Sequence, residues 1–283
     1  MPVPGTEVYA DGLTLAAGGG AYITAAWLVA LGQPAALAAH WPAAPFDAAI
    51  MAQVTAAGVD AAACVAAPSG ADPQVTLALV TGGDRAFVTR RAGPAVPASL
   101  IDVIAAGRHR HLHVGELATL VEAPMLVRAA RAAGMTVSAD CAWDAEVLAR
   151  RDLATVLEGV DVFLPNRMEA EALARHQPLA ALAPLVVVKE GAEGATAITH
   201  EQKLHRPARP VKVVDTVGAG DAFNAGFLTG WLAGRGLAAC LDAGAAAAAQ
   251  ALVRRGGASG LARGGLAGPR TMAAHSTGVV ADH

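Results

Sequence analysis

Aromatic residues and cysteines are scarce in this sequence. Aromatic side chains account for 4% of the 283 residues, and the three cysteines, Cys64, Cys141 and Cys240, lie far apart and form no C-x-x-C pair. This spacing argues against a disulfide framework and a zinc knuckle, and it suits a reducing, cytoplasmic environment. Because 54% of the residues are hydrophobic but few are aromatic, alanine, valine and leucine must build the core.

The sequence also lacks an excess of positive charge, a signal peptide and a membrane-spanning segment. It has 21 Lys and Arg against 24 Asp and Glu, a net charge of -3, so we expect no nucleic acid as a partner. The opening residues contain neither the basic nor the apolar region of a signal peptide. Residues 12–39 are uncharged, but glycines at 18–20 and a proline at 34 interrupt them. A buried strand, a turn and a core helix are therefore expected there rather than a membrane helix.

Strands and helices alternate through the middle of the chain. Such alternation predicts an α/β fold, namely a three-layer, doubly wound, mostly parallel sheet with helices on both faces. Ligands in folds of this kind bind at the carboxyl ends of the strands. The strands are expected at 111–114, 135–139, 160–164 and 185–189, and the helices at 124–133, 145–157 and 168–175.

The two ends of the chain depart from this alternation. Helices are expected at 21–31 and 47–57, because each of these segments is closed by a glycine. After Ala262 the sequence is rich in Gly, Pro, Ser, Thr and His, which predicts a disordered tail over 263–283 and one domain over 1–262. A small separate sheet is expected from three β-rich segments: 7–15, 74–80 and 85–90.

The segment from Val211 to Leu232 carries the most chemistry. Its β-branched beginning, Val211–Val214, predicts a strand, a turn with two glycines follows, and an apolar helix is expected over 222–232. Backbone N–H groups at a helix N-terminus are free to bind an anion, and the helix dipole favours negative charge there. Asp221, beside this anion site, is suited to act as a base in phosphoryl transfer to a hydroxyl. An ordinary helix start is the alternative, since glycine and aspartate are common there for capping reasons.

The same segment resembles the signature D-T-x-G-A-G-D of the PfkB (ribokinase-like) family of carbohydrate kinases. The matching residues are Asp215, Thr216, Gly218, Ala219, Gly220 and Asp221. The resemblance implies an ATP-dependent kinase that phosphorylates a hydroxyl of a small sugar or sugar-like substrate and uses Mg²⁺. Asp221 would be the catalytic base, and the N–H groups of the glycine turn would stabilise the transferred phosphoryl group. Thr216 would contact ATP, and Asp215 would lie by a site for a monovalent cation such as K⁺.

Two further motifs resemble the nucleotide end of the same family. Asn166 and Glu169 match its N-x-x-E motif, which implies that they organise magnesium and the phosphates. They also have the spacing of a capping box at a helix start, and both interpretations can hold together. Lys189, Gly191 and Gly194 match the strand and glycine turn beneath the ATP phosphates, whereas a plain hairpin turn is the alternative.

The acceptor end of the resemblance is less regular. Gly18 and Gly19, followed by a helix, match the family's sugar-binding motif, which implies that they contact the substrate together with Thr24. The family usually has an asparagine in that helix to bind sugar hydroxyls, and this chain has Ile23 there. Asp140 and Glu116 follow two of the expected strands and are the other candidates for contacting the acceptor.

The beginning of the chain differs from the family pattern. Family members begin with a strand that lies inside the main sheet and carries a glycine and a substrate-binding aspartate. A Pro-Gly turn then leads into a lid, which the resemblance identifies with the small separate sheet expected from segments 7–15, 74–80 and 85–90. This chain starts at that turn, Pro4-Gly5, so the first strand is expected to be missing, which would leave backbone groups unpaired. Either the true start lies upstream of Met1, or the chain is a degenerate member of the family. A degenerate, non-catalytic protein that binds nucleotide or sugar is therefore the second hypothesis. Lid strands in this family often pair between subunits, so a homodimer through the lid is also expected.

Three histidines suggest a different class of function. His109, His111 and His113 alternate along one strand, and alternation places them on one face. Three imidazoles on one face could hold a metal ion, as in zinc hydrolases. The alternative is a solvated strand entry with incidental histidines, since no carboxylate-rich motif at metal-ligand spacing accompanies them.

Overall fold

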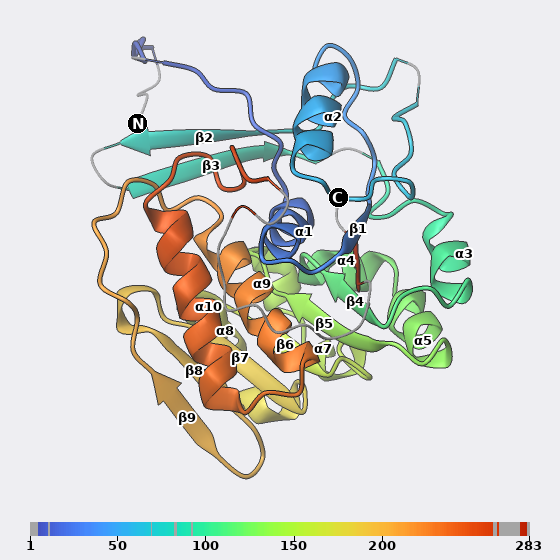
Figure 1. Cartoon of the computed structure of the whole chain (residues 1–283), viewed down its shortest axis with the longest axis vertical. Helices are drawn as coiled ribbons and strands as arrows, with labels where there is room; N and C mark the ends of the chain where they lie inside the picture. Colours follow the sequence, from blue (N-terminus) through green and yellow to red (C-terminus); the bar gives the residue numbers. More distant parts are fainter. Residues whose placement is uncertain are drawn as a thin grey trace.

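The computed structural model describes residues 5–10, 12–68, 70–81, 84–91, 93–262, 265 and 278–281. These residues form an eight-stranded sheet, a separate two-stranded sheet, and helices that cover both faces of the larger one (Figure 1). The expected α/β class with a mostly parallel sheet is confirmed. The larger sheet places part of the site, because Asp140 and Lys189 end two of its strands, and Glu116 and Asn166 follow two others.

The main sheet is parallel except at one end. Its order is β1-β10-β4-β5-β6-β7-β8-β9, and every pair from β1 to β7 is parallel, whereas β7, β8 and β9 pair in antiparallel fashion. The carboxyl ends of the parallel strands therefore share one edge. The bounds are β1 Ala35–Ala38, β4 His111–Val114, β5 Thr136–Asp140, β6 Val162–Leu164, β7 Leu185–Lys189, β8 Ala195–Ile198, β9 Lys203–Arg206 and β10 Gly278–Ala281.

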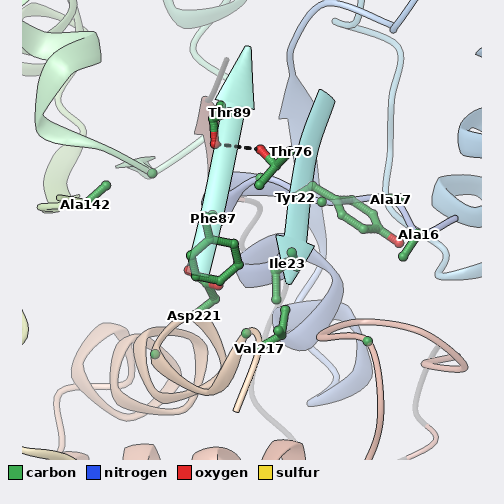
Figure 2. A pocket seen from close by; sticks show the side chains of 18 of the residues that line it. Ala16, Ala17, Tyr22, Ile23, Thr76, Phe87, Thr89, Ala142, Val217 and Asp221 are labelled. Carbon is green, nitrogen blue, oxygen red and sulfur yellow. Dashed lines mark hydrogen bonds between the residues drawn. The ribbon is translucent and has the colours of Figure 1, made fainter. Parts of the chain in front are cut away.

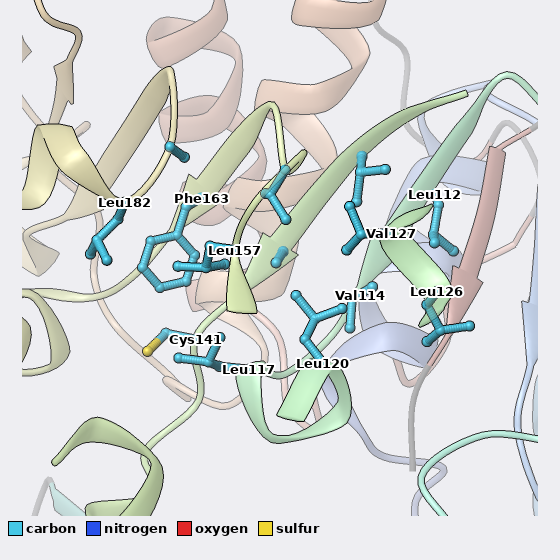
Figure 3. Packing of buried hydrophobic residues seen from close by; sticks show 14 of the residues in the cluster. Leu112, Val114, Leu117, Leu120, Leu126, Val127, Cys141, Leu157, Phe163 and Leu182 are labelled. Carbon is cyan, nitrogen blue, oxygen red and sulfur yellow. The ribbon is translucent and has the colours of Figure 1, made fainter. Parts of the chain in front are cut away.

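Helices cover both faces of the sheet, and each face has its own core. Leu112 and Val114 of β4 face one core (Figure 3), whereas α1, α2, α9 and α10 pack on the opposite face. The first face is covered by α3 Leu100–Ala105, α4 Leu117–Glu122, α5 Met125–Ala132, α6 Ala145–Leu148, α7 Leu153–Val156, α8 Arg167–Ala174 and the short η1 Leu179–Ala181. The second is covered by α1 Gly20–Ala30, α2 Asp47–Ala56, α9 Ala219–Leu232 and α10 Leu237–Leu252. The helix expected over 145–157 is two short helices, α6 and α7.

Helix α1 is the core helix expected within the uncharged run. It begins after Gly19, whose φ of 92° favours glycine, and its residues 21–30 are all buried. A helix that is apolar all round must be buried, and α1 packs against α9 as well as the sheet. None of the helices in the described part of the chain has the length and apolar character that a membrane crossing requires.

Strand β10, from the end of the chain, lies inside the main sheet. It pairs in parallel with β1 on one side and β4 on the other, so that Val279 lies opposite both Ala36 and Leu112. The disordered tail expected over 263–283 is therefore wrong for residues 278–281, and the rest of that tail, apart from residue 265, lies outside the described residues. We also expected that the absence of an inner strand would leave backbone groups unpaired. This is wrong for the described residues, because the backbone of β10 pairs with β1 on one side and with β4 on the other.

The lid differs from the expectation in one strand. β2 (Val75–Thr81) and β3 (Asp84–Arg90) form the expected antiparallel pair, with Ala78 opposite Phe87. The third strand, expected over 7–15, is wrong, because the described residues of that segment form no strand. Val8, Tyr9 and Leu13 are exposed there, so no neighbouring strand covers them.

The strand expected before the glycine turn is wrong as well. Val211–Val214 is irregular, and the side chains of Val213 and Val214 are exposed. The Val214 N–H instead donates to the carbonyl oxygen of Leu252, at the end of α10, over 2.7 Å. The segment is thus fixed by a helix end rather than by a sheet.

Candidate active site

One large cleft contains nearly all the residues singled out from the sequence. It lies between the main sheet and the lid and measures about 3060 Å³. Pockets for one small ligand measure roughly 300–1,000 Å³, so this cleft has room for two substrates together. Its lining includes Gly18, Gly19, Glu116, Asp140, Asn166, Glu169, Lys189, Gly191, Gly194, Asp215, Thr216, Gly218, Ala219, Gly220 and Asp221.

Asp221 lies where the N-termini of two helices meet. It belongs to the first turn of α9, whose N-cap, Gly218, has the left-handed φ of 73°. A Cβ atom added to Gly20, the first residue of α1, would lie 3.2 Å from Asp221 Oδ1. The carboxylate is therefore close to two sets of first-turn N–H groups, which lack intrahelical partners and attract anions.

The glycine turn is held by close backbone packing. A Cβ atom on Gly218 would lie 2.7 Å from the Cα atom of Gly257, so no larger residue fits without movement. Asp215 fixes the same turn, because its two carboxylate oxygens accept the N–H groups of Val217 and Gly256, each over 2.9 Å. The shape of the turn thus depends on the segment before α9 and on the segment after α10.

A buried polar network lies behind the glycine turn. Lys189, at the end of β7, donates to both carboxylate oxygens of Asp140 over 2.8 Å and to Asn224 Oδ1 over 3.2 Å. Asn224 in turn donates to Asp140 over 2.6 Å. Burial opposes the charge on Lys189, but the nearby carboxylates, Asp140 first, hold its pKa above the usual value. A Cβ atom on Gly220 would lie 3.6 Å from Lys189 Nζ, so the ammonium group lies directly beneath the turn.

Asn166 and Glu169 form the capping box that their spacing allows. Asn166 Oδ1 accepts the Glu169 N–H over 3.0 Å, and Glu169 Oε2 accepts the Asn166 N–H over 2.7 Å. Glu169 is buried, and burial, together with the charge of Asp140, raises its pKa to about 7. The structural interpretation of this motif is therefore confirmed, and its role toward magnesium stays a prediction.

The second glycine turn connects β7 to β8. Its residues 191–193 form the short helix η2, and Gly191 has a φ of 62°. A Cβ atom on Gly194 would overlap the carbonyl oxygen of Arg206, so the backbone at the end of β9 passes directly over this residue. The turn joins the antiparallel strands β7 and β8, so the hairpin alternative is confirmed, and the turn also lines the cleft.

At the acceptor end, the carboxylate of Glu116 is paired with an arginine, whereas Thr24 lies outside the cleft. Glu116, the N-cap of α4, accepts a hydrogen bond from Arg91 over 2.9 Å, and burial raises its pKa. Thr24 is fully buried and is absent from the residues that line the cleft. Its hydroxyl contacts the backbone oxygen of Asp221 at 3.5 Å, so its predicted contact with the substrate is not supported.

Sequence reasoning missed three residues of the cleft and its surroundings. Phe87 and Arg91 belong to the lid and its end. Their local sequence does not indicate that the lid lies over the cleft, so it could not show that they line it. Asn224 could have been found, because it follows Asp221 by three residues and therefore shares its side of the helix.

The histidine strand forms no metal site. His111 and His113 are buried on the face of β4 that lies under α9, and Ser138 bridges them at 2.7 and 2.8 Å. His111 also contacts Thr136 at 2.8 Å and packs edge-on against Trp231. Within the described residues, no group of three or more histidine, cysteine, aspartate or glutamate side chains is arranged to hold a metal ion. The alternative prediction, that these histidines lie at a solvated strand entry, is also wrong for His111 and His113, because both are buried.

The buried histidine pair predicts a loss of stability in mild acid. Burial lowers the pKa of His111 to about 3 and that of His113 to about 4. Below pH 6.5 the unfolded chain binds protons that the folded protein does not, so the free energy of unfolding falls by about 1.4 kcal/mol per pH unit for each histidine until the folded pKa is reached. Urea unfolding at pH 7.5 and 5.5 measures this slope. We expect His111→Gln to flatten it and His200→Gln, at an exposed turn, to leave it unchanged; equal slopes in all three proteins would contradict the assignment.

Comparison with known sequences identifies a family that spans most of the chain. The pfkB family carbohydrate kinase model matches residues 3–262. An uncharacterized sugar kinase of Archaeoglobus fulgidus is 37% identical over 119 residues, which is 40% of this chain and 48% of that protein. The chain thus spans about half the length, or less, of the curated relatives that it matches.

Solved structures share the fold over a longer range. The adenosine kinase of Sinorhizobium meliloti superposes with a TM-score of 0.75 and 25% identity, over 87% of this chain and 81% of that one. The ribokinase of Arabidopsis thaliana, complexed with ribose and ATP, gives a TM-score of 0.71 and 18% identity over 90% and 88% of the two chains. The ribokinase-like fold is therefore established over most of the described residues.

Proposed function

Because the chain belongs to the pfkB family of carbohydrate kinases, we propose that it transfers the terminal phosphoryl group of ATP to a hydroxyl of a small sugar-like or nucleoside-like molecule. The observation that carries this proposal is the position of Asp221, at the meeting point of α1 and α9 beside the Gly218–Gly220 turn. A base and an anion site are the two components that phosphoryl transfer to an alcohol requires.

In the proposed reaction Asp221 accepts the proton of the acceptor hydroxyl. The hydroxyl oxygen then forms a bond to the γ-phosphorus, the bond from that phosphorus to the bridging oxygen breaks, and ADP leaves with the electron pair. The N–H groups of Gly218, Ala219 and Gly220 stabilise the negative charge on the transferred oxygens. Closure of β2 and β3 over the cleft excludes water, which would otherwise compete as acceptor.

We place ATP along the nucleotide end of the cleft, over the 191–194 turn. Thr216 and Asn166 line this end, and the two glycine turns leave backbone accessible to phosphate oxygens. The Arabidopsis ribokinase, which shares the fold, is complexed with ATP, and this supports the nucleotide. Lys189 lines the cleft beneath the turn and is paired to Asp140 and Asn224, so it places a positive charge under Gly220.

The carboxylates near Lys189 would hold a magnesium ion only indirectly. Asp140, Glu169 and Asp221 line the cleft and lie near this ammonium group, but these three described side chains do not form a cluster arranged to ligate a metal ion. Magnesium keeps several of its waters, and these waters would connect the ion to the carboxylates. Glu169 and Asn166 would hold the ion indirectly, and the ion would neutralise charge on the phosphates.

Other parts of the proposal remain predictions from the resemblance. A monovalent cation such as K⁺ beside Asp215, a homodimer through the lid and a cytoplasmic location belong to this group.

The direct test is acceptor-dependent release of ADP. Purified protein with ATP and Mg²⁺ is offered free sugars and nucleosides one at a time, and ADP is measured. We expect ADP release that requires one of the acceptors. Binding of ATP and acceptor without ADP release would indicate the non-catalytic alternative instead.

A further inference from the structure

The cleft next to Asp221 is apolar. Figure 2 shows side chains that line the pocket containing this carboxylate, and alanine, isoleucine, valine and aromatic residues predominate among those labelled. Besides Asp221, the labelled side chains with polar atoms are Thr76 and Thr89, which hydrogen-bond each other at 3.0 Å, and Tyr22, whose ring carries one hydroxyl. The apolar members are Ala16, Ala17, Ile23, Phe87, Ala142 and Val217.

The charged side chains at this end already have partners. Glu116 accepts from Arg91 over 2.9 Å, and Asp140 is held by Lys189 over 2.8 Å. A free pentose or hexose has several hydroxyls, and each one buried without a partner costs roughly 1–3 kcal/mol. A site that binds such a sugar tightly therefore needs polar side chains that are available to the ligand.

Ile23 makes the inner wall of this region apolar. It is buried, and its Cγ2 atom would lie 3.0 Å from a Cβ atom placed on Gly218. Its Cδ1 atom would lie 3.3 Å from a Cβ atom placed on Gly257. The side chain therefore packs against the anion-binding turn itself, where it offers van der Waals contact and no hydrogen bond.

Phe87 makes the outer wall apolar. It lies on β3 of the lid, lines the cleft and is 51% exposed. Figure 2 shows its ring on the lid strand, whereas Ile23 and Asp221 belong to helices α1 and α9 on the other side of the cleft. When the flat ring of a ligand covers a half-exposed aromatic side chain, the side chain gains van der Waals contact and is shielded from water. Such ring pairs contribute about 0.5–1.5 kcal/mol of binding free energy beyond that of area burial.

From these two walls we infer that the acceptor is an alcohol carried on an aromatic or heteroaromatic ring, such as a nucleoside, rather than a free pentose or hexose. The inference rests on the proposed phosphoryl transfer. The ring lies between Phe87 and Ile23, and one hydroxyl reaches Asp221, which removes its proton as the phosphoryl group is transferred from ATP.

The test compares nucleosides with free sugars in the same assay. ADP release is measured with adenosine, cytidine, inosine and uridine, and with ribose, fructose and glucose. We expect the best nucleoside to have a kcat/KM at least tenfold above the best sugar. A free sugar that equals or exceeds every nucleoside overturns the inference.

Binding separates this inference from the proposed function. If no compound releases ADP, a thermal shift with each compound decides: stabilisation by nucleosides alone supports the inference and contradicts the kinase activity. Stabilisation by free sugars instead, or by neither class, overturns the inference.

A lid variant tests the ring contact without disturbing the core. Phe87→Ala is expected to raise KM for the best nucleoside roughly 3- to 10-fold with little change in kcat, because one ring contact is lost. Val88→Ala is the matched control: this neighbour on β3 is 60% exposed, points to the opposite side of the strand and does not line the cleft. If Phe87→Ala and Val88→Ala give the same KM, the contact and the inference are wrong.

Discussion

Replacement of Asp221 by asparagine is expected to lower kcat by roughly 10²–10⁴-fold, because the acceptor hydroxyl loses its base. Asparagine has nearly the same shape, so the first turn of α9 and the adjacent Gly20 keep their packing. ATP binding should therefore survive, and steady-state kinetics together with calorimetric titration of ATP measure the two effects separately.

A second aspartate provides the control for this substitution. Asp47 also lies in the first turn of a helix, α2, but it does not line the cleft. Asp47→Asn removes the same favourable interaction between a carboxylate and a helix N-terminus, so its effect on stability should match that of Asp221→Asn while its turnover stays normal. Near-normal turnover of Asp221→Asn would exclude this residue as the base.

Disruption of β10 is expected to have the largest effect on stability. Because this strand lies between β1 and β4, each of its N–H groups faces one neighbour or the other, and proline at any position removes a hydrogen bond from the interior of the sheet. We expect Val280→Pro to destabilise the protein by about 3 kcal/mol, within the upper range of single substitutions. For a chain of this size, that corresponds to a Tm lower by roughly 6–12 °C.

Two further variants define the role of β10. Val280→Ile keeps a β-branched residue and the N–H group, so its Tm should stay close to that of the unchanged protein. Removal of residues 263–283 should abolish cooperative unfolding, since β1 and β4 would lie two strand spacings apart with unpaired edges. A truncated protein with an unchanged Tm would show that β10 contributes nothing to the sheet.

The strand also affects the site through β4. Gly115, which follows β4, approaches helix α1 so closely that a Cβ atom on it would lie 2.5 Å from the Ala21 nitrogen. The same contact holds the N-terminus of α1 beside Asp221. A β10 variant that still folds should therefore lose turnover together with stability, whereas the Asp221 variant loses turnover alone.

The sequence predicted which residues gather in the cleft better than it predicted the individual strands around them. The glycine turn, Asp221 and the N-x-x-E motif are local patterns in which neighbouring residues determine the geometry, and all of them line the cleft. The β/α alternation was likewise readable, because buried parallel strands form apolar runs between helices.

The pairing of strands that lie far apart in the chain could not be predicted from the sequence. Gly278–Ala281 is a four-residue segment in a glycine- and histidine-rich tail, and only the position between β1 and β4 makes it a strand. Ala35–Ala38 was missed because alanine has little preference for strands. For Val211–Val214 the error was the opposite one, because a strand was predicted and none forms. Its β-branched residues suit a strand, but its hydrogen-bond partner is the end of α10.

The central claim, transfer of a phosphoryl group from ATP to an acceptor hydroxyl at Asp221, is tested most directly by following the γ-phosphorus itself. ATP labelled at that atom is incubated with the protein, Mg²⁺ and the best acceptor, and the products are separated. The account predicts that the label appears as a phosphate ester of the acceptor, one for each ADP formed, and that Asp221→Asn forms this ester at least 100-fold more slowly, at the lower end of the general-base range of roughly 10²–10⁴. Label found only as inorganic phosphate, or only in unreacted ATP, would contradict it.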